Sequence, residues 1–232
     1  WITQVGGPGE DTLRALTGAQ ANVVAVGETA GLEGTPSTGG TDLLVATLGT
    51  SGELGSLTST GSIGDDTAAG VAADESVTAC GSTTGDLGAA SGGGVDAWCA
   101  TVDSDGAVGS PTQLGGIDDE RATGVGTRSG MGHAYVSGTL SGLLPGAQDP
   151  TGRGLGNGDA LAMQVDAAGR PVWARQFGTG VEDGAMAAAG NSDGDGVVVG
   201  YTDGDLEGRS KGGRDSWISR FDPSGNQRWI TQ

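Results

Sequence analysis

Acidic residues recur at two fixed places in the chain, and a ring of carboxylates could bind a divalent cation or catalyse hydrolysis. One set ends a glycine-rich turn: Asp11, Asp66, Glu120 and Asp183. The other follows a glycine-rich approach: Asp42, Asp96, Asp159 and Asp215. A catalytic residue is needed once, whereas a carboxylate that accepts backbone N–H groups in a turn is needed in every copy of the turn. The repetition therefore favours a structural function for both sets.

A second candidate is the segment that begins at Asn191, where Asn191, Asp193 and Asp195 alternate before Gly196 as in the first half of a calcium loop. The acidic residue that completes an EF-hand is missing, because Thr202 stands six positions after Gly196. No other repeat has the pattern. A solvated hairpin turn is the favoured interpretation, calcium is the alternative, and no other cofactor is expected.

The cysteines and the histidine limit the remaining chemistry. Cys80 and Cys99 lie in two strands predicted to be neighbours, so they either form a disulfide or stay as buried thiols. Their columns in the other repeats hold Val26, Val136 and Val199, and Val45, Ala162 and Ile218. The single histidine, His133, belongs to another repeat, and no phosphate loop or zinc spacing accompanies it. Glycosidase chemistry needs only two carboxylates, such as Asp118 and Asp119, and remains the enzymatic alternative to the non-enzyme that we expect.

The elements that carry these residues form an internal repeat. Strand-like openings fall at Trp1, Ser56, Ser110 and Trp173, and WITQ recurs at Trp229. The repeats are therefore 1–55, 56–109, 110–172 and 173–228, and 229–232 repeats the first strand. Each repeat holds four strand-like segments. The third segment ends in Gly-x-Thr at Gly27, Gly81 and Gly200, with Ser137 as the substitute in the third repeat.

These repeats predict an all-β fold in one domain, residues 1–232. The 49 glycines and the frequent Gly, Asp, Ser and Thr clusters indicate many tight turns between short strands. Four strands in each repeat of this length are typical of a β-propeller blade. A β-solenoid is the main rival, but its coils are usually shorter and its strands do not pair through local hairpins.

The fourth repeat, WARQFGTGVEDGAMAAAGNSDGDGVVVGYTDGDLEGRSKGGRDSWISRFDPSGNQRW, resembles the bacterial β-propeller repeat called SBBP. The resemblance covers all four repeats and is weakest in the third. It rests on W-x-x-Q-F-G-T, G-Y-T-x-G and G-G-x-D-x-[WF]. The resemblance implies a propeller fold, a secreted or surface-exposed location and an interaction role.

The two copies of WITQ raise the question of closure. We expect a closed four-bladed ring, because propellers hide their sheet edges by closing. One copy is then surplus, and Trp229, Ile230, Thr231 and Gln232 form a candidate interaction strand. A slice of a longer array and end-to-end assembly are the alternatives. Trp98 and Trp217 are expected to pack between blades, and so are Trp1, Trp173 and Trp229.

The net charge of the chain disfavours some classes of binding partner. The chain has 29 acidic and 11 basic residues, a net charge of −18, which disfavours nucleic acid and anionic membranes. No apolar run approaches membrane-spanning length, so no membrane insertion is expected. The leading hypothesis is a non-catalytic extracellular or cell-surface domain for adhesion, assembly or scaffolding through a protein partner or itself. The alternative is a propeller that binds a small ligand or glycan at its central face or in the loop from Ser141 to Gly158.

Overall fold

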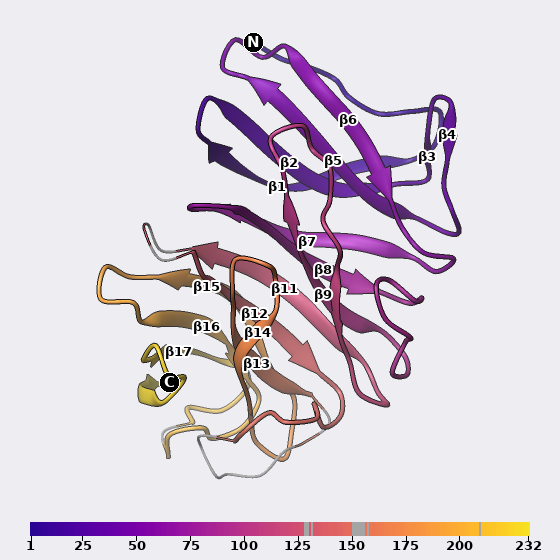
Figure 1. Ribbon diagram of the computed structural model, residues 1–232. Coiled ribbons are helices and arrows are strands. Elements are labelled where there is room, and N and C mark those ends of the chain that lie inside the picture. Colours follow the sequence, from indigo (N-terminus) through magenta and orange to yellow (C-terminus); the bar gives the residue numbers. More distant parts are fainter. Residues whose placement is uncertain (128–129, 131, 150–155, 157, 209) are drawn as a thin grey trace.

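The computed structural model describes residues 1–127, 130, 132–149, 156, 158–208 and 210–232, and these form an all-β protein. Four antiparallel sheets of four strands follow one another along the chain (Figure 1). Blade 1 contains β1 (Asp11–Ala19), β2 (Asn22–Thr29), β5 (Asp42–Gly49) and β6 (Leu54–Thr60). Blade 2 contains β7 (Asp66–Ala73), β8 (Val77–Thr83), β9 (Asp96–Val102) and β10 (Thr112–Leu114).

The two other blades repeat this order. Blade 3 contains β11 (Glu120–Thr127), β12 (Ala134–Leu140), β13 (Asp159–Val165) and β14 (Pro171–Phe177). Blade 4 contains β15 (Asp183–Gly190), β16 (Gly196–Thr202), β17 (Asp215–Phe221) and β18 (Gln227–Thr231). A small hairpin of β3 (Gly31–Leu32) and β4 (Thr35–Pro36) extends from blade 1. The architecture is that of propeller-like blades.

The blades are out of phase with the sequence repeats. Each blade begins at the acidic residue that ends the glycine-rich turn, and its last strand is the opening segment of the next repeat. Trp173, which opens the fourth repeat, therefore lies in the outer strand of blade 3. The turn before each outer strand contains a glycine with positive φ: Gly52, Gly106, Gly169 and Gly225. Such a glycine is typical of a hairpin with a bulge, which joins two strands of one sheet.

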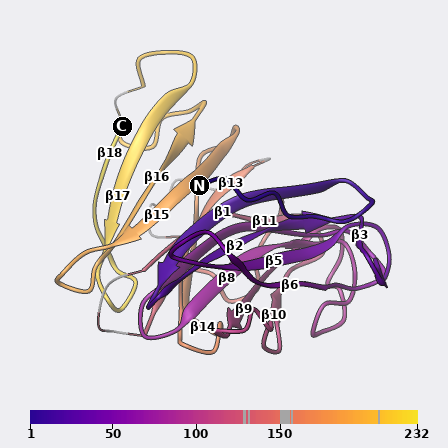
Figure 2. The same cartoon turned by 90° about the horizontal axis from the view of Figure 1, so that it is seen from above.

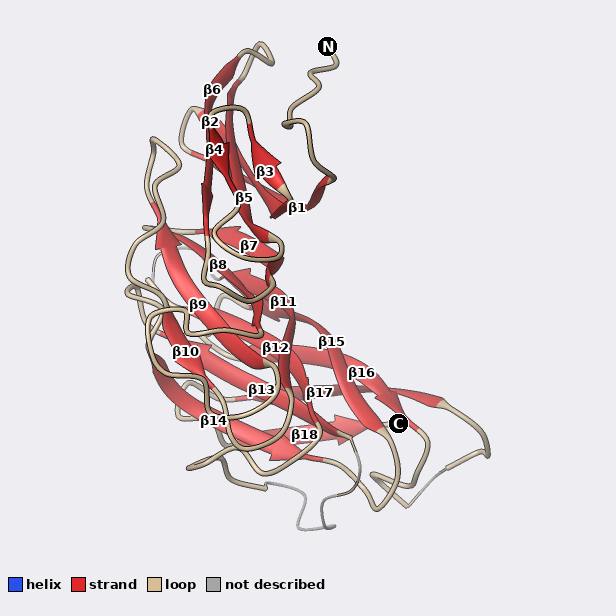
Figure 3. Ribbon diagram, turned by 90° about the vertical axis from the view of Figure 1, so that its right-hand side faces the viewer, coloured by secondary structure: helices blue, strands red, loops and turns tan. Residues whose placement is uncertain are grey.

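The blades pack in chain order and form an open row rather than a closed ring. The main contacts between sheets join blade 1 to blade 2, blade 2 to blade 3 and blade 3 to blade 4. Figure 3 shows the row from the side, with blade 1 at one end and blade 4 at the other, whereas blade 1 overlaps the middle blades in the view from above in Figure 2. The expected closure of a four-bladed ring is thus not shown, because blade 4 does not lie against blade 1.

The core lies between successive blades. Val45 of blade 1 and Val71 of blade 2 belong to one buried cluster, and Cys99 and Ala122 join blades 2 and 3 in another. The third cluster joins blades 3 and 4 through Trp173, Phe177, Trp217 and Phe221. The predicted burial of Trp98, Trp173 and Trp217 between blades is confirmed. The same prediction for Trp1 and Trp229 is wrong, because these side chains are 71% and 42% exposed.

A bulge in the first strand of every blade explains why the second strand of the blade contains a glycine, the one that ends the third segment of each sequence repeat. The pairing shifts by one residue at Leu13/Ala15 and at the equivalent place in the other blades. The glycines opposite are Gly27, Gly81, Gly138 and Gly200. A Cβ on Gly27 would lie 1.8 Å from the Thr12 carbonyl oxygen, so only glycine fits.

This register corrects two sequence expectations by one residue each. Gly138, not Ser137, occupies the glycine column of the third repeat, because it pairs with Ala122 beside the bulge. Ser137, not Val136, is the counterpart of Cys80, because each of them immediately precedes its repeat's glycine. The Gly-x-Thr pattern is displaced in this repeat, because Leu140 stands opposite the acidic start of the first strand, where the other repeats have Thr29, Thr83 and Thr202.

We predict that Gly27→Ala destabilises the protein by about 1–3 kcal/mol, because the added methyl group forces the bulge apart. Gly18→Ala is the matched control in the same pair of strands, since a Cβ there meets nothing within 4 Å. The control should change stability by less than about 1 kcal/mol. Urea unfolding measures both, and equal effects would contradict the close approach at Gly27.

Candidate functional site

The recurring carboxylates hold backbone turns, which confirms the structural interpretation. Each acidic residue of the first set accepts a hydrogen bond from the backbone N–H four residues earlier, such as Ser62 to Asp66 at 2.5 Å. The second set does the same over three or four residues, as from Thr38 to Asp42 at 2.9 Å. The chain therefore uses these side chains to shape every blade.

Three glutamines fasten the outer strands. Gln232 accepts a hydrogen bond from the Leu206 N–H and donates to the Gly204 carbonyl and to Asp215. Gln113 and Gln176 make the same three contacts in blades 2 and 3. In blade 1 Ser59 stands in this place, so Asp42 has no glutamine partner. Sequence reasoning missed this contact, although the Gln of W-x-x-Q was visible in the pattern.

Buried carboxylates also meet in pairs where one blade passes to the next. Gly61 lies against both Asp42 and Asp66, and Gly178 lies against Asp159 and Asp183. Burial raises the pKa of Asp42 above the usual carboxyl range, and the charge of Asp66 raises it further. Burial raises the pKa of Glu120 and Asp159 in the same way, beside Asp96 and Asp183.

The calcium-like segment forms a hairpin turn between β15 and β16. The Asn191 side-chain oxygen accepts the backbone N–H groups of Asp193 and Asp195. Both aspartates form ion pairs with Arg220. This guanidinium neutralises the carboxylates that a calcium ion would need, so the geometry favours the hairpin interpretation. No group of three or more His, Cys, Asp or Glu side chains able to hold a metal ion occurs among the described residues.

Cys80 and Cys99 face each other in β8 and β9 and are joined by a disulfide with a Cα–Cα distance of 4.1 Å. His133 lies just before β12 in the following blade. Of the two carboxylates suggested for hydrolysis, Asp119 accepts hydrogen bonds from Val95 and Arg121, one on each oxygen. The hydrogen bond from Arg121 holds the pKa of Asp119 below its usual range.

The first blade exposes the face that would meet a preceding blade, here named the leading face. Leu16 lies five residues after the acidic start of its strand and is 70% exposed. Val71 holds the same place in blade 2 and is 6% exposed, because blade 1 covers it. Leu13 is also exposed, whereas its counterparts Ala68, Ala122 and Ala185 are buried. The leading face of blade 1 is thus an apolar surface without the cover that its counterparts have.

The last blade exposes the opposite face, here named the trailing face. Ile218 lies three residues after the aspartate of its strand and is 38% exposed. Its counterparts Val45 and Cys99 are fully buried against the following blade. Val199 and Trp229 are exposed on the same face of blade 4. The ends of the row are therefore the two halves of the contact that occurs three times inside it.

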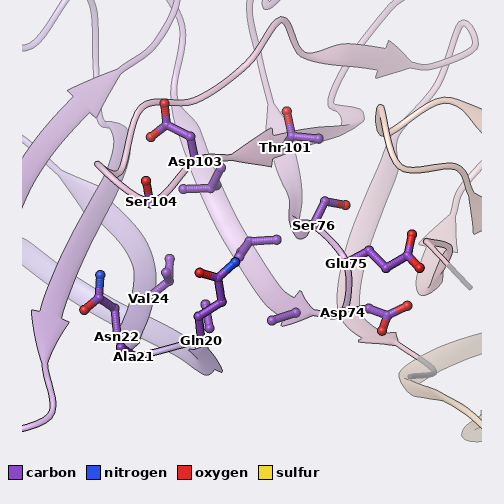
Figure 4. A pocket seen from close by; sticks show the side chains of 14 residues that line it. Gln20, Ala21, Asn22, Val24, Asp74, Glu75, Ser76, Thr101, Asp103 and Ser104 are labelled. Atoms are coloured by element: carbon purple, nitrogen blue, oxygen red, sulfur yellow. The ribbon is translucent and has the colours of Figure 1, made fainter. Parts of the chain in front are cut away.

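A separate cavity of about 480 Å³ lies between blades 1 and 2. Gln20, Asn22, Asp74, Glu75 and Ser104 are among the side chains around it (Figure 4). Gln20, with φ of 52°, is the one non-glycine residue of the described segments with a positive φ. The long third-repeat loop, the other suggested ligand site, is described only in part, because positions 150–155 and 157 lie outside the described residues.

No helix in the described part of the chain is long and apolar enough to cross a membrane. No known protein family and no curated protein matches the sequence. Of the resemblance to the bacterial β-propeller repeat, the structure shows the propeller-like blades. Membership of that family stays an expectation.

Two solved structures are distantly similar. A Bacteroides caccae protein of unknown function shares 12% identity over 82% of this chain, with a TM-score of 0.44. The match spans only about half of that protein, 54% of its length. The periplasmic gluconolactonase of Pseudomonas aeruginosa shares 11% identity over 94% of this chain and 84% of its own, with a TM-score of 0.34.

We predict that Asp42→Asn stabilises the protein at pH 7. Because burial raises the pKa of Asp42 in the folded state, the native protein loses stability as the pH rises from the unfolded carboxyl pKa to the folded one. Asparagine keeps the oxygen for Thr38 and avoids this loss. The gain should be about 1 kcal/mol, or about 2–4 °C in Tm, and should shrink towards pH 4. Thermal unfolding at both pH values tests this, with exposed Asp105→Asn as the charge control. A gain that is equal at both values would contradict the argument.

Proposed function

We propose that this protein is a non-catalytic repeat domain that works through protein–protein contacts at the two ends of its row of blades. The observation that carries the proposal is the exposure of Leu13 and Ile218, whose counterparts are buried in every contact between blades. Apolar surfaces that are buried wherever the repeat continues indicate a place for another blade. Adhesion, assembly and scaffolding all use such contacts.

The two end faces are also where a ring would close. A closed four-bladed ring would bury Leu16 against blade 4 of the same chain. In the open row Leu16 and Ile218 are exposed instead, and we place the contact with another protein at these two faces. Resemblance to the bacterial β-propeller repeat supports the same interaction role.

An extracellular or cell-surface location is part of the proposal. The disulfide between Cys80 and Cys99 supports it, because disulfides persist in oxidising compartments. The net charge of −18 keeps such a domain soluble and away from nucleic acids.

A small polar ligand or glycan is the second candidate, favoured by the cavity between blades 1 and 2. Its volume lies within the range of about 300–1,000 Å³ found for ligand sites, and the unusual backbone of Gln20 borders it. Calorimetric titration with a panel of sugars would support this function if Asn22→Ala removes the heat of binding and Asn226→Ala, in a distant turn, does not.

We predict that the chain associates in solution through its end faces. The double variant Leu16→Glu/Ile218→Glu should stay at the monomer mass of 22.5 kDa, because the two surfaces that would meet then carry like charges. The wild type should exceed this mass at high concentration. Light scattering over a concentration series measures both.

The matched control is Ile63→Glu/Ile117→Glu, which alters two exposed isoleucines in the connections between blades. It should associate as the wild type does. A wild type that stays monomeric throughout would count against the proposed function.

A further inference from the structure

We propose that the partner is a second copy of this chain, docked head to tail, with the trailing face of its blade 4 on the leading face of blade 1. This inference rests on the proposed function. It adds the identity of the partner, the direction in which the two copies dock and the segment that docking displaces. It follows from the three contacts between blades inside the chain, which supply a template for the fourth.

In the contacts between successive blades, a hairpin turn of one blade packs on the outer strands of the blade before it. Inside the chain, the turn at Gly106 packs on Thr47 and Ser56 of blade 1, and the turn at Gly225 packs on Trp173 and Arg175 of blade 3. On blade 4 the counterparts of Thr47 and Ser56 are Arg220 and Trp229. These two side chains line a cleft of about 410 Å³ on the trailing face. The turn at Gly52 of a second copy is the matching element.

In a single copy, the turn at Gly52 is covered by residues 1–4, which lie where the outer strand of a preceding blade would lie. The Trp1 ring lies on Gly52, as Trp173 lies on Gly225. The Thr3 hydroxyl donates to the Gly52 carbonyl, as Thr58 donates to the Gly106 carbonyl. Residues 1–4 thus occupy blade 1 as the outer strand of a preceding blade would. They hold the place that 229–232 of a docked copy would take with the same sequence, WITQ.

The two copies of WITQ differ in how firmly they are held. Residues 229–231 pair with β17, and Gln232 makes its three hydrogen bonds within blade 4. Residues 1–4 belong to no strand, and Ile2 is 99% exposed. Docking therefore displaces residues 1–4 and keeps β18 in place. Trp229 then covers Gly52 of the neighbour, and the apolar faces become buried.

The net charge of each copy determines how association depends on salt. Each copy carries a net charge of −18, so docking brings together two acidic molecules. Near the contact, exposed Arg228 of the cleft faces the turn that carries Glu53. We expect association to strengthen as salt rises from about 0.05 to 0.5 M, because screening weakens the overall repulsion.

The polarity is tested by mixing two variants that block opposite faces. Leu16→Glu and Ile218→Glu should each weaken self-association by about tenfold or more. Mixed in equal amounts they should form dimers that grow no further, because one intact leading face meets one intact trailing face. Light scattering reads the mass, and circular dichroism checks folding. If Ile218→Glu does not fold, Ile218→Ser replaces it.

The displaced strand is tested by the same substitution in its two copies. Trp1→Ala should strengthen association, because residues 1–4 then leave Gly52 more easily. Trp229→Ala should weaken it, because the neighbour then lacks the ring that covers Gly52. Sedimentation velocity gives both dissociation constants, and each should shift by about tenfold in its own direction.

Other outcomes overturn the inference in distinguishable ways. A monomeric wild type would remove the second copy and the proposed function together. Association that survives in Ile218→Glu alone, or mixtures that stay monomeric, would leave a contact between copies but refute its polarity. The opposite response to Trp1→Ala and Trp229→Ala would show that residues 1–4 replace β18 instead.

Discussion

A β-sheet with two apolar faces needs a neighbour on each side, and this requirement governs the whole molecule. Blades 1, 2 and 3 each bury the trailing face on the next blade, and each hydrophobic cluster of the described residues joins two blades. Val45 and Val71, from different sheets, belong to one cluster, and the disulfide side of blade 2 packs on Ala122 of blade 3. Stability is therefore shared between nearest neighbours, as in other repeat proteins.

The polar network follows from the same stacking. Connections between blades cross from the outer edge of one sheet to the inner edge of the next, so their backbone N–H groups become buried. The carboxylates of Asp66 and its counterparts accept these groups, and Gln113, Gln176 and Gln232 fasten the outer strands over them. Two carboxylates then share a buried space, which raises the pKa of Asp42.

Much of this fold could be predicted from the sequence, because the repeat carries it. Spacing of the acidic turns gave four blades of four strands, and repetition of Asp42 and Asp66 indicated turns rather than catalysis. The one-residue error at Ser137 arose because Thr139 was aligned with the threonines of the other repeats, whereas Leu140 occupies that column and pairs with Glu120. Closure and the exposure of Trp229 could not be predicted, because a repeat pattern describes contacts between neighbours and contains no information on the curvature of the row. The glutamine contacts were also missed, since they join residues 17 to 34 positions apart, such as Leu206 and Gln232, which are 26 positions apart.

The phase shift between repeats and blades also determines when each blade can be completed during translation. A blade lacks its outer strand until the ribosome has delivered the opening of the next repeat, so blade 3 waits with β13 as an open edge until Pro171–Phe177 emerges. The long loop from Ser141 to Gly158 separates β12 from β13, so before that β12 is the open edge for longer than its counterparts. An open edge on a growing chain is a template for wrong pairing with nearby nascent chains. The acidic charge of the repeats then works as a gatekeeper while the polypeptide is incomplete, because like-charged nascent chains repel one another.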